Sequence, residues 1–286
     1  MLTGCDLSHH NAVPPSFLPW AFACIRVSFG RGERGDPEAD ERADLHAAKM
    51  RATHPACVGV AFAWMNLGDP KAQADLLVTR EAIVGCGRWG LAIDVEDLPG
   101  HDPFPRSLVA RNLLAMLDVL AARDGRKPLV YGSGGYLAEM FAEAPITMRQ
   151  VEARASLWLA DWSAPYTIPQ PWTRATIVQD RGAKPGGIDH DVFAGDAGEL
   201  RAVLGLAAGP LPPAMTHGLL ARGSIGPDVR ELQVKLNRHG ARPLLVVDGI
   251  FGAKTEGALR VFQRAAGLLD TACADDPTWA ALDRGA

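Results

Sequence analysis

The stretch WGLAIDVED, residues 89–97, decides how the first two thirds of this 286-residue chain fold. Its apolar residues predict a buried strand, and Asp94 and Glu96 stand at the carboxyl end of that strand. Because residues two apart on a strand point to the same face, both acids share one side. Two such acids either lie at a strand end that is exposed to solvent, or they are buried and are then hydrogen-bonded or used in chemistry.

Apolar runs of the same kind recur on both sides of this stretch. We predict strands at 3–8, 22–28, 57–64, 89–96, 127–131, 156–162, 175–180 and 187–193. Helices are expected between the earlier strands, and the dipeptides Asp36-Pro37 and Asp69-Pro70 are typical helix starts, with Asp as the cap and Pro in the first turn. Five β-then-α units followed by three strands predict an α/β fold, an irregular TIM-like (β/α)5(β)3 barrel with parallel strands.

The last third of the chain has a different pattern. Residues 206–217 form a Pro/Gly-rich stretch without charge, which predicts a linker after a catalytic barrel at 1–205. Beyond it, Val229, Leu232 and Leu236 follow a helical period, and Leu259 and Phe262 repeat it. Residues 218–286 are therefore expected to form a second, small all-α domain, and a body of this size more often binds than catalyses.

Composition narrows the classes of partner. The chain is 48% hydrophobic and 22% charged, and its net charge of −4 does not favour a nucleic-acid partner. No apolar stretch approaches the roughly 18 residues of a membrane span, so no membrane partner is expected. The opening residues lack the pattern of a secretory signal. Five cysteines without CxxC pairing predict a chain made in a reducing cytoplasm without disulfides. We also expect the protein to be a monomer.

If the barrel forms, the ends of its strands meet at one mouth. The residues delivered there are Asp6, Asp94, Glu96, Trp158, Asp161, Gln179, Asp189 and Asp191, and the aromatic residues nearby are Trp64, Tyr131 and Trp162. Several acids in one cleft push their pKa values apart, which provides one protonated acid beside an ionised partner. Aromatic faces suit sugar rings, so acids and aromatics at a barrel mouth indicate glycoside hydrolysis.

Seven short motifs occur in a fixed order across residues 3–195: GCDLSHHN, VGVAF, AIDVED, VYGS, LWLADW, IVQD and GIDHDVFAG. In this order and spacing they resemble the lysozymes of glycoside hydrolase family 25, the Chalaropsis-type muramidases. The resemblance implies hydrolysis, without a cofactor, of the β-1,4 bond between N-acetylmuramic acid and N-acetylglucosamine in bacterial peptidoglycan. By motif, Glu96 would be the general acid, Asp94 its partner stabilising charge, and Asp6 and Asp189 supporting carboxylates. Substrate contacts are expected from Tyr131, Trp158, Asp161, Gln179, Asp191 and Trp64.

The residues leave the mechanism open. Strand positions two apart place their Cα atoms roughly 6.5–7 Å from each other, a range that fits retaining and inverting enzymes alike. A third route uses the acetamido carbonyl of the substrate as nucleophile, with Asp94 orienting it. Departures from the family pattern include Ala61-Phe62-Ala63, where a Tyr-His-Phe-like run is usual, and Arg26, where Lys is common. We expect altered substrate contacts from these changes.

The small domain resembles the helical peptidoglycan-binding domain of many wall hydrolases. The match lies in GSIGPDVRELQVKLNRHG, VDGIFGAKTEGALRVFQRAAGL and DPTWAAL, between residues 223 and 282. A second DG-x-x-G turn is expected before the last of these, and DTACADDP (270–277) stands in its place. The pairing of both domains without a signal peptide indicates a phage endolysin, made in the host cytoplasm and released to the wall by a holin-type protein.

Other interpretations were weighed beside this one. His9-His10 and Asp189-His190-Asp191 could hold a metal ion, but strand alternation sends His190 away from its neighbours, so no metal site is expected. The glycines at 132–135 favour a turn over a phosphate loop. Two alternative functions stay open: a non-catalytic protein that grips wall glycan, and a related glycosidase that acts on another wall polysaccharide.

Overall fold

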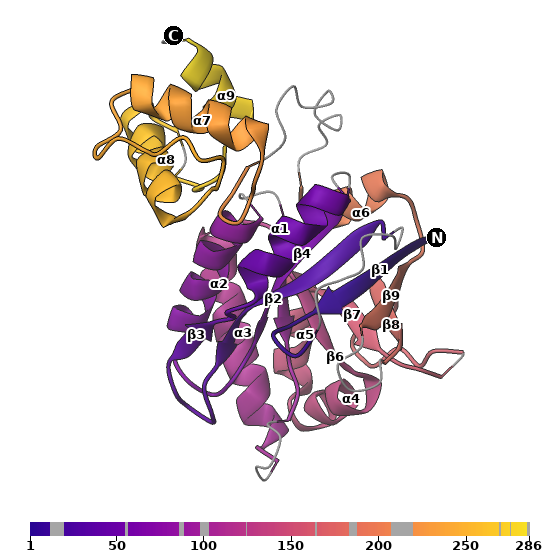
Figure 1. Ribbon diagram of the computed structural model, residues 1–286. Helices are drawn as coiled ribbons and strands as arrows, with labels where there is room; N and C mark the ends of the chain where they lie inside the picture. The colour runs from indigo at the N-terminus through magenta and orange to yellow at the C-terminus, as the bar shows by residue number, and fades with distance from the viewer. Residues whose placement is uncertain are drawn as a thin grey trace.

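The computed structural model describes residues 1–11, 20–54, 57–85, 89–97, 103–123, 125–163, 165–182, 188–206, 220–268, 270–274 and 276–284. Figure 1 shows a barrel with helices outside its strands, and a smaller body of helices formed by the C-terminal residues. The predicted linker 206–217 falls outside the described residues except for Leu206. The domain boundaries at this linker therefore stay a prediction.

One sheet forms the barrel. Its strands among the described residues are β1 Leu2–Leu7, β2 Phe22–Gly30, β3 Pro37–Ala39, β4 Val58–Trp64, β5 Gly90–Asp94, β6 Leu129–Ser133, β7 Ser156–Ala160, β8 Ile177–Arg181 and β9 Asp189–Phe193. The strand order is β1-β9-β8-β7-β6-β5-β4-β2-β3, and β1 also pairs with β2, so that eight strands close the ring and β3 adds to one edge. The predicted irregular TIM-like barrel is confirmed.

Strand β9 differs from the parallel arrangement that the sequence predicts. It runs antiparallel to both of its neighbours, β8 and β1. Only residues 182–188 join β8 to β9, and a parallel crossover needs a dozen residues or more. The reversal places the first residue of β9 at the mouth instead of its last, and Asp189 lies opposite Asp6 in the register.

Helices follow most of the early strands. Their bounds are α1 Ala43–Thr53, α2 Pro70–Val84, α3 Arg106–Arg123, α4 Gly134–Glu143, α5 Pro145–Arg154 and α6 Ala197–Val203. Asp69 caps α2 as predicted, because its side chain accepts a hydrogen bond from the backbone N–H of Lys71. The predicted helix start at Asp36-Pro37 is wrong: Pro37 begins β3, which folds back antiparallel on the end of β2, and the helix begins at Ala43.

Two apolar layers hold the barrel together. In the larger layer, strand residues that point outward, such as Leu157, pack against helix residues such as Leu113. Strand residues that point inward fill the barrel, and they are joined by Leu200 of α6 and by Leu204, which directly follows that helix. A Cβ on Gly90 would lie 2.7 Å from the Leu204 side chain, so a glycine at the start of β5 lets α6 pack closely against the barrel.

The C-terminal helices are α7 Pro227–Arg238, α8 Ala253–Ala265 and α9 Asp276–Asp283. Their core contains the predicted residues Val229, Leu232, Leu236 and Leu259, with Phe262 packed at its edge. The predicted helical period is therefore confirmed here, and this body has a core separate from those of the barrel.

Two glutamines clamp two turns of this body in the same way. Gln233 Oε1 accepts a hydrogen bond from the N–H of Gly249 (3.0 Å), and Gln263 Oε1 accepts one from the N–H of Ala272 (3.1 Å). Both clamped residues have positive φ, 77° for Gly249 and 57° for Ala272. The stretch DTACADDP thus keeps a clamped turn, with alanine in the place that glycine takes in the first turn.

The cysteines do not all follow expectation. Cys5, Cys24 and Cys57 are free. Cys273 is disulfide-bonded, so the prediction of a chain without disulfides is wrong at this residue. Its Sγ lies 3.2 Å from the carbonyl oxygen of Ile83 in α2, which brings the second clamped turn against the barrel. A contact between residues this far apart in the chain depends on how the two bodies dock, which local sequence does not encode.

None of the described helices combines the length and the apolar character needed to cross a membrane.

Candidate active site

The inward-facing residues of the strands change from apolar to polar toward one end of the barrel. The pairs that show this change are Ala92 and Asp94 on β5, Leu129 and Tyr131 on β6, Ile177 and Gln179 on β8 and, in reverse chain order, Phe193 and Asp191 on β9. Because side chains two apart share a face, each polar residue stands directly above an apolar one. The barrel therefore has an apolar floor and a polar mouth.

Gln179 is the central hydrogen-bonding residue of this mouth. It is 4% exposed, and its Nε2 donates to Asp6 Oδ2 at 2.8 Å. Its Oε1 accepts from the hydroxyl of Tyr131 (3.2 Å) and from the indole N–H of Trp162 (3.3 Å). These bonds fix the amide orientation and tie residues from β1, β6 and the end of β7 to one group.

Asp6 is an acid with an unusual pKa. Burial and the negative charge of Asp189 together raise the pKa of its carboxyl to about 7, although the hydrogen bond from Gln179 acts in the opposite direction. The two acids face each other in the register between β1 and β9. Asp6 therefore keeps its proton up to nearly neutral pH.

The structure places Trp158 and Asp191 beneath the site, not in its wall. Trp158 is 1% exposed, and its ring packs edge-on against Phe62 and Tyr131, with centroids 5.7 and 4.7 Å away. Its Nε1 donates to Asp191 Oδ1 at 2.8 Å, and burial raises the pKa of Asp191 well above its usual value. The expectation that the Trp158 face meets a sugar is corrected: the inward register of β7 buries the ring.

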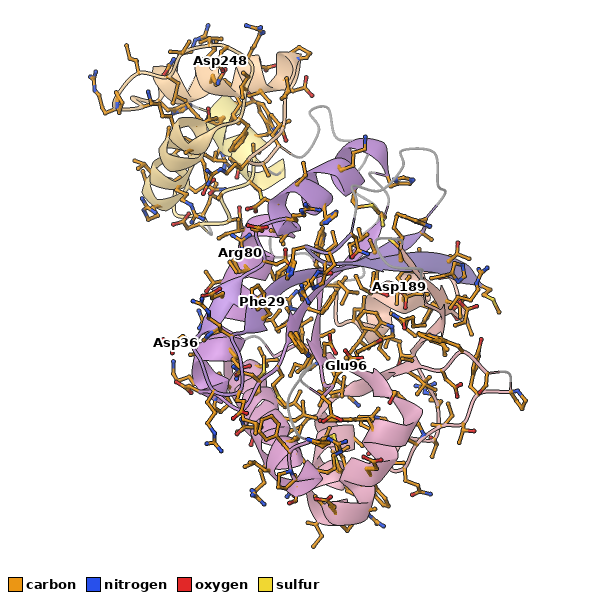
Figure 2. All side chains as sticks on the ribbon, turned by 60° about the horizontal axis from the view of Figure 1, so that its bottom comes forward. Phe29, Asp36, Arg80, Glu96, Asp189 and Asp248 are labelled. Atoms are coloured by element: carbon orange, nitrogen blue, oxygen red, sulfur yellow. The ribbon has the colours of Figure 1, made fainter. Side chains whose placement is uncertain are left out.

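Asp94 and Glu96 lie two residues apart at the carboxyl end of β5. Asp94 is the last residue of β5 and 8% exposed, and its buried Oδ1 has no hydrogen-bond partner among the described residues. Glu96 lies beyond the strand end and opens to solvent. Burial and the charge of Glu96 raise the pKa of Asp94, and surrounding protein atoms and the charge of Asp189 raise the pKa of Glu96. Figure 2 shows Glu96 and Asp189 in the barrel body.

Arg26 on β2 supplies the positive charge of the site. Its Nε donates to Asp40 Oδ2 (3.0 Å) and its Nη2 to His9 Nδ1 (2.5 Å), and its charge lowers the pKa values of Asp94 and Glu96. Sequence reasoning noted Arg26 only as a departure from the family pattern. The available signal was a charge in the middle of an otherwise apolar strand, FACIRVSFG.

Two predicted site residues have other surroundings. Asp161 accepts hydrogen bonds from Ser163 and from the N–H of Thr167, which closes the loop after β7 and holds the pKa of Asp161 below its usual value. Trp64 ends β4 opposite Asp94 in the register, and its buried Nε1 has no partner among the described residues. Trp64 thus lies beside Asp94, whereas the hydrogen bonds of Asp161 stabilise the loop that follows β7.

His190 points to the strand face opposite Asp189 and Asp191, as strand alternation predicts, and its Nδ1 lies 2.5 Å from Asp180 Oδ1. Within the described ranges, no group of three or more His, Cys, Asp and Glu side chains is arranged to hold a metal ion. The chemistry that this mouth offers is proton transfer and charge stabilisation by carboxyls.

Comparison with solved structures identifies the fold of the barrel. The barrel is similar to a muramidase from Acremonium alcalophilum (18% identity, TM-score 0.60), over 71% of this chain and 99% of that one. It is also similar to a family 25 lysozyme from Aspergillus fumigatus (17% identity, TM-score 0.54), over 71% and 98%. A bacterial lysozyme from Streptomyces coelicolor matches over 71% and 96%, with 19% identity and a TM-score of 0.51. The barrel has the fold of the family 25 lysozymes.

The similarity to these structures extends over 71% of the chain. Residues 225–282 match a different family model, described as "Putative peptidoglycan binding domain". This agrees with the expected helical peptidoglycan-binding domain. No curated protein matches the chain. Within the lysozyme fold, the unusual Phe62 is the inward residue of its run and packs on Trp158, while Ala61 and Ala63 face the helices.

Proposed function

We propose that this protein is a peptidoglycan muramidase that hydrolyses the β-1,4 bond between N-acetylmuramic acid and N-acetylglucosamine. The observation that carries the proposal is the coupled acid pair Asp94 and Glu96 at the polar mouth of a lysozyme-fold barrel. Support comes from the peptidoglycan-binding match at residues 225–282, which would hold the barrel near its substrate.

Glu96 is the proton donor in this proposal. It opens to solvent and its pKa is raised, so it can reach a glycosidic oxygen while still protonated. As the bond from the anomeric carbon to that oxygen breaks, the electron pair stays on the oxygen, which takes the proton of Glu96 and leaves as a hydroxyl. Water then adds to the anomeric carbon and returns a proton to Glu96.

Asp94 is the partner charge. In the free site, burial favours the proton on Asp94, because its pKa is raised by burial as well as by Glu96. Its unpartnered buried Oδ1 is an acceptor that lacks a donor. An acetamido N–H of the substrate would fill this place, stabilise the ionised form of Asp94 and leave the shared proton on Glu96. This arrangement supports the route in which the acetamido carbonyl acts as nucleophile.

Asp6 and Asp189 complete the set as supporting carboxylates, and Gln179 with Tyr131 holds Asp6 in place. Gln179 donates to Asp6 and accepts from Tyr131, so the orientation of the first acid depends on both. We expect Trp64 and Trp162 to contact the glycan, because Trp64 stands beside Asp94 and Trp162 is 68% exposed.

The test measures new reducing sugar ends released from purified peptidoglycan. Glu96→Gln should lose activity by about a hundredfold or more, the range expected for removal of a general acid. Asp36→Asn is the matched control, since it makes the same carboxyl-to-amide change at an exposed residue after β2. Full activity in Glu96→Gln contradicts the proposal. Wall binding by the unaltered protein without any turnover would favour the non-catalytic alternative, and product masses that do not fit muropeptides would favour another glycosidase.

We further propose that the protein is a phage endolysin that reaches the wall from the host cytoplasm through a holin-type opening. The pairing of a lysozyme fold with a peptidoglycan-binding match supports a wall target. Expressed in the cytoplasm of a sensitive bacterium, the protein should leave cells intact until a pore-forming protein is co-induced. Lysis without such a pore would contradict the release route but not the activity.

A further inference from the structure

A pocket adjoins the acid pair at the amino-terminal end of α4. Its volume is about 310 Å³, and Glu96, Asp97, Ser133 and Tyr136 line it. Small-molecule sites occupy roughly 300–1,000 Å³, so this one suits a single ring-sized unit. Three of its four lining residues lie outside the site that the sequence predicts.

Arg106 fixes the walls of this pocket. Its two Nη atoms donate to the two carboxylate oxygens of Asp97 (2.5 and 2.9 Å), and its Nε donates to Glu139 Oε2 (2.9 Å). Its guanidinium carbon lies 3.9 Å from the ring centroid of Tyr136. The Arg106 side chain is only 10% exposed. Because one buried cation joins the segment after β5 to α4, the Tyr136 ring keeps a fixed place beside Glu96.

The charges of the pocket select against an anion. The guanidinium of Arg106 is shared between Asp97 and Glu139, and the lining itself carries the carboxyls of Glu96 and Asp97. Ser133 accepts a hydrogen bond from the N–H of Tyr136, which leaves its own hydroxyl hydrogen to donate. An aromatic ring, a hydroxyl donor and carboxylate acceptors together suit a neutral ring that bears hydroxyl groups.

We propose that this pocket binds the N-acetylglucosamine unit that leaves when the glycosidic bond breaks, with Tyr136 as its aromatic wall. The assignment rests on the proposed function, in which Glu96 protonates the oxygen of the leaving sugar. A proton donor must lie within hydrogen-bond reach of that oxygen, between the two sugar units. The described lining of the pocket includes Glu96 but not Asp94, which in the proposed function faces the acetamido group of the muramic unit, so the pocket is on the leaving side. The muramic unit, whose lactyl group ends in a carboxyl or in a peptide, fits this acidic pocket less well.

The test titrates β-1,4-linked N-acetylglucosamine oligomers into the Glu96→Gln protein by calorimetry. Adding Tyr136→Leu should weaken binding about tenfold, whereas Tyr136→Phe, which keeps the ring, should change it less than twofold. Tyr166→Leu is the matched control, because Tyr166 is an exposed tyrosine in the loop after β7. Melting temperatures of all variants are compared, so that a loss of fold is recognised.

A competition experiment keeps the proposal open to refutation if Tyr136→Leu does not fold. Free N-acetylglucosamine should displace the oligomer from the Glu96→Gln protein, and free N-acetylmuramic acid should displace it far less. Equal displacement by both sugars, unchanged binding in Tyr136→Leu, an equal loss in Tyr166→Leu, or no binding at all would each overturn the assignment. Failure of the proposed function is a separate result, because it appears as turnover by Glu96→Gln and not as a change in these affinities.

Discussion

Replacement of Ala272 by glycine should stabilise the peptidoglycan-binding body. Ala272 has a φ of 57°, while the equivalent clamped residue of the first turn is Gly249, with a φ of 77°. Both donate their N–H to a glutamine side chain, so the hydrogen bond holds the backbone in the left-handed region whatever the side chain. Only alanine has a Cβ that is strained there.

The size of the effect follows from two opposing terms. The left-handed conformation costs an L-residue roughly 1–2 kcal/mol, and glycine would recover this. Glycine also adds about 0.4–1 kcal/mol of entropy to the unfolded chain. The difference predicts a net stabilisation of about 0.5–1 kcal/mol for Ala272→Gly. The reverse change, Gly249→Ala, should destabilise by at least ~1 kcal/mol, because its Cβ would also lie 3.0 Å from Arg230 Cγ and 3.1 Å from the carbonyl oxygen of Gly226.

Hydrogen exchange, carried out on the whole protein, measures the change in local stability of the peptidoglycan-binding body. Peptides from residues 253–283 should exchange about two- to fivefold more slowly in Ala272→Gly, since 1.4 kcal/mol corresponds to a factor of ten. Peptides from α3 in the barrel serve as the internal control and should not change. Faster exchange in Ala272→Gly, or no change in Gly249→Ala, would refute the reasoning that the glutamine clamp enforces the same backbone in both turns.

Three further outcomes are expected. Asp69→Ala removes the cap of α2 and should cost about 1 kcal/mol in urea unfolding, whereas Asp36→Ala, where no helix begins, should cost nothing; equal costs would contradict the cap assignment. Because the pKa of Asp6 is raised from 3.8 to about 7, its stabilising contribution is complete below about pH 4 and is lost as the pH rises through 7. The free energy of unfolding should therefore fall between about pH 4 and pH 7. Asp6→Asn should make this pH dependence less steep, and an unchanged pH dependence would count against the raised pKa of Asp6. Arg26→Met leaves the fully buried Asp40 without its guanidinium and should lower the free energy of unfolding by roughly 3–5 kcal/mol, while Arg26→Lys should lose less; equal losses would show that charge pairing is not the cause.

Local pattern was enough to predict the barrel. Buried strands reveal themselves by continuous apolar runs, and the observed β4 and β5 lie within the predicted 57–64 and 89–96. The helix start predicted at Asp36-Pro37 was wrong because a capping pattern shows only that a helix can begin there. In the structure, the residues from Pro37 instead pair with the edge of β2 as strand β3. The direction of β9 was missed for a similar reason, since an apolar period carries no direction along the sheet.

The candidate site, like the fold, could be predicted from the sequence only in part. Its carboxyls could be found from the chain, because an acid at the end of an apolar strand is unusual wherever it occurs. The depth of Trp158 could not, since alternation sets the face of a residue but not its height in the barrel. The arrangement of Arg106 with Tyr136 joins residues from two helices, and no spacing along the chain announces it.

The place of β1 in the ring has a consequence for synthesis of the protein. β1 leaves the ribosome before the other described strands of this sheet, yet it pairs on one side with β2 and on the other with β9, more than 180 residues later. Until Phe193 has emerged, the nascent sheet therefore carries an unpaired edge at both β1 and β8. A chain truncated before β9 should expose those edges and aggregate, so the fold is completed late in translation and all at once.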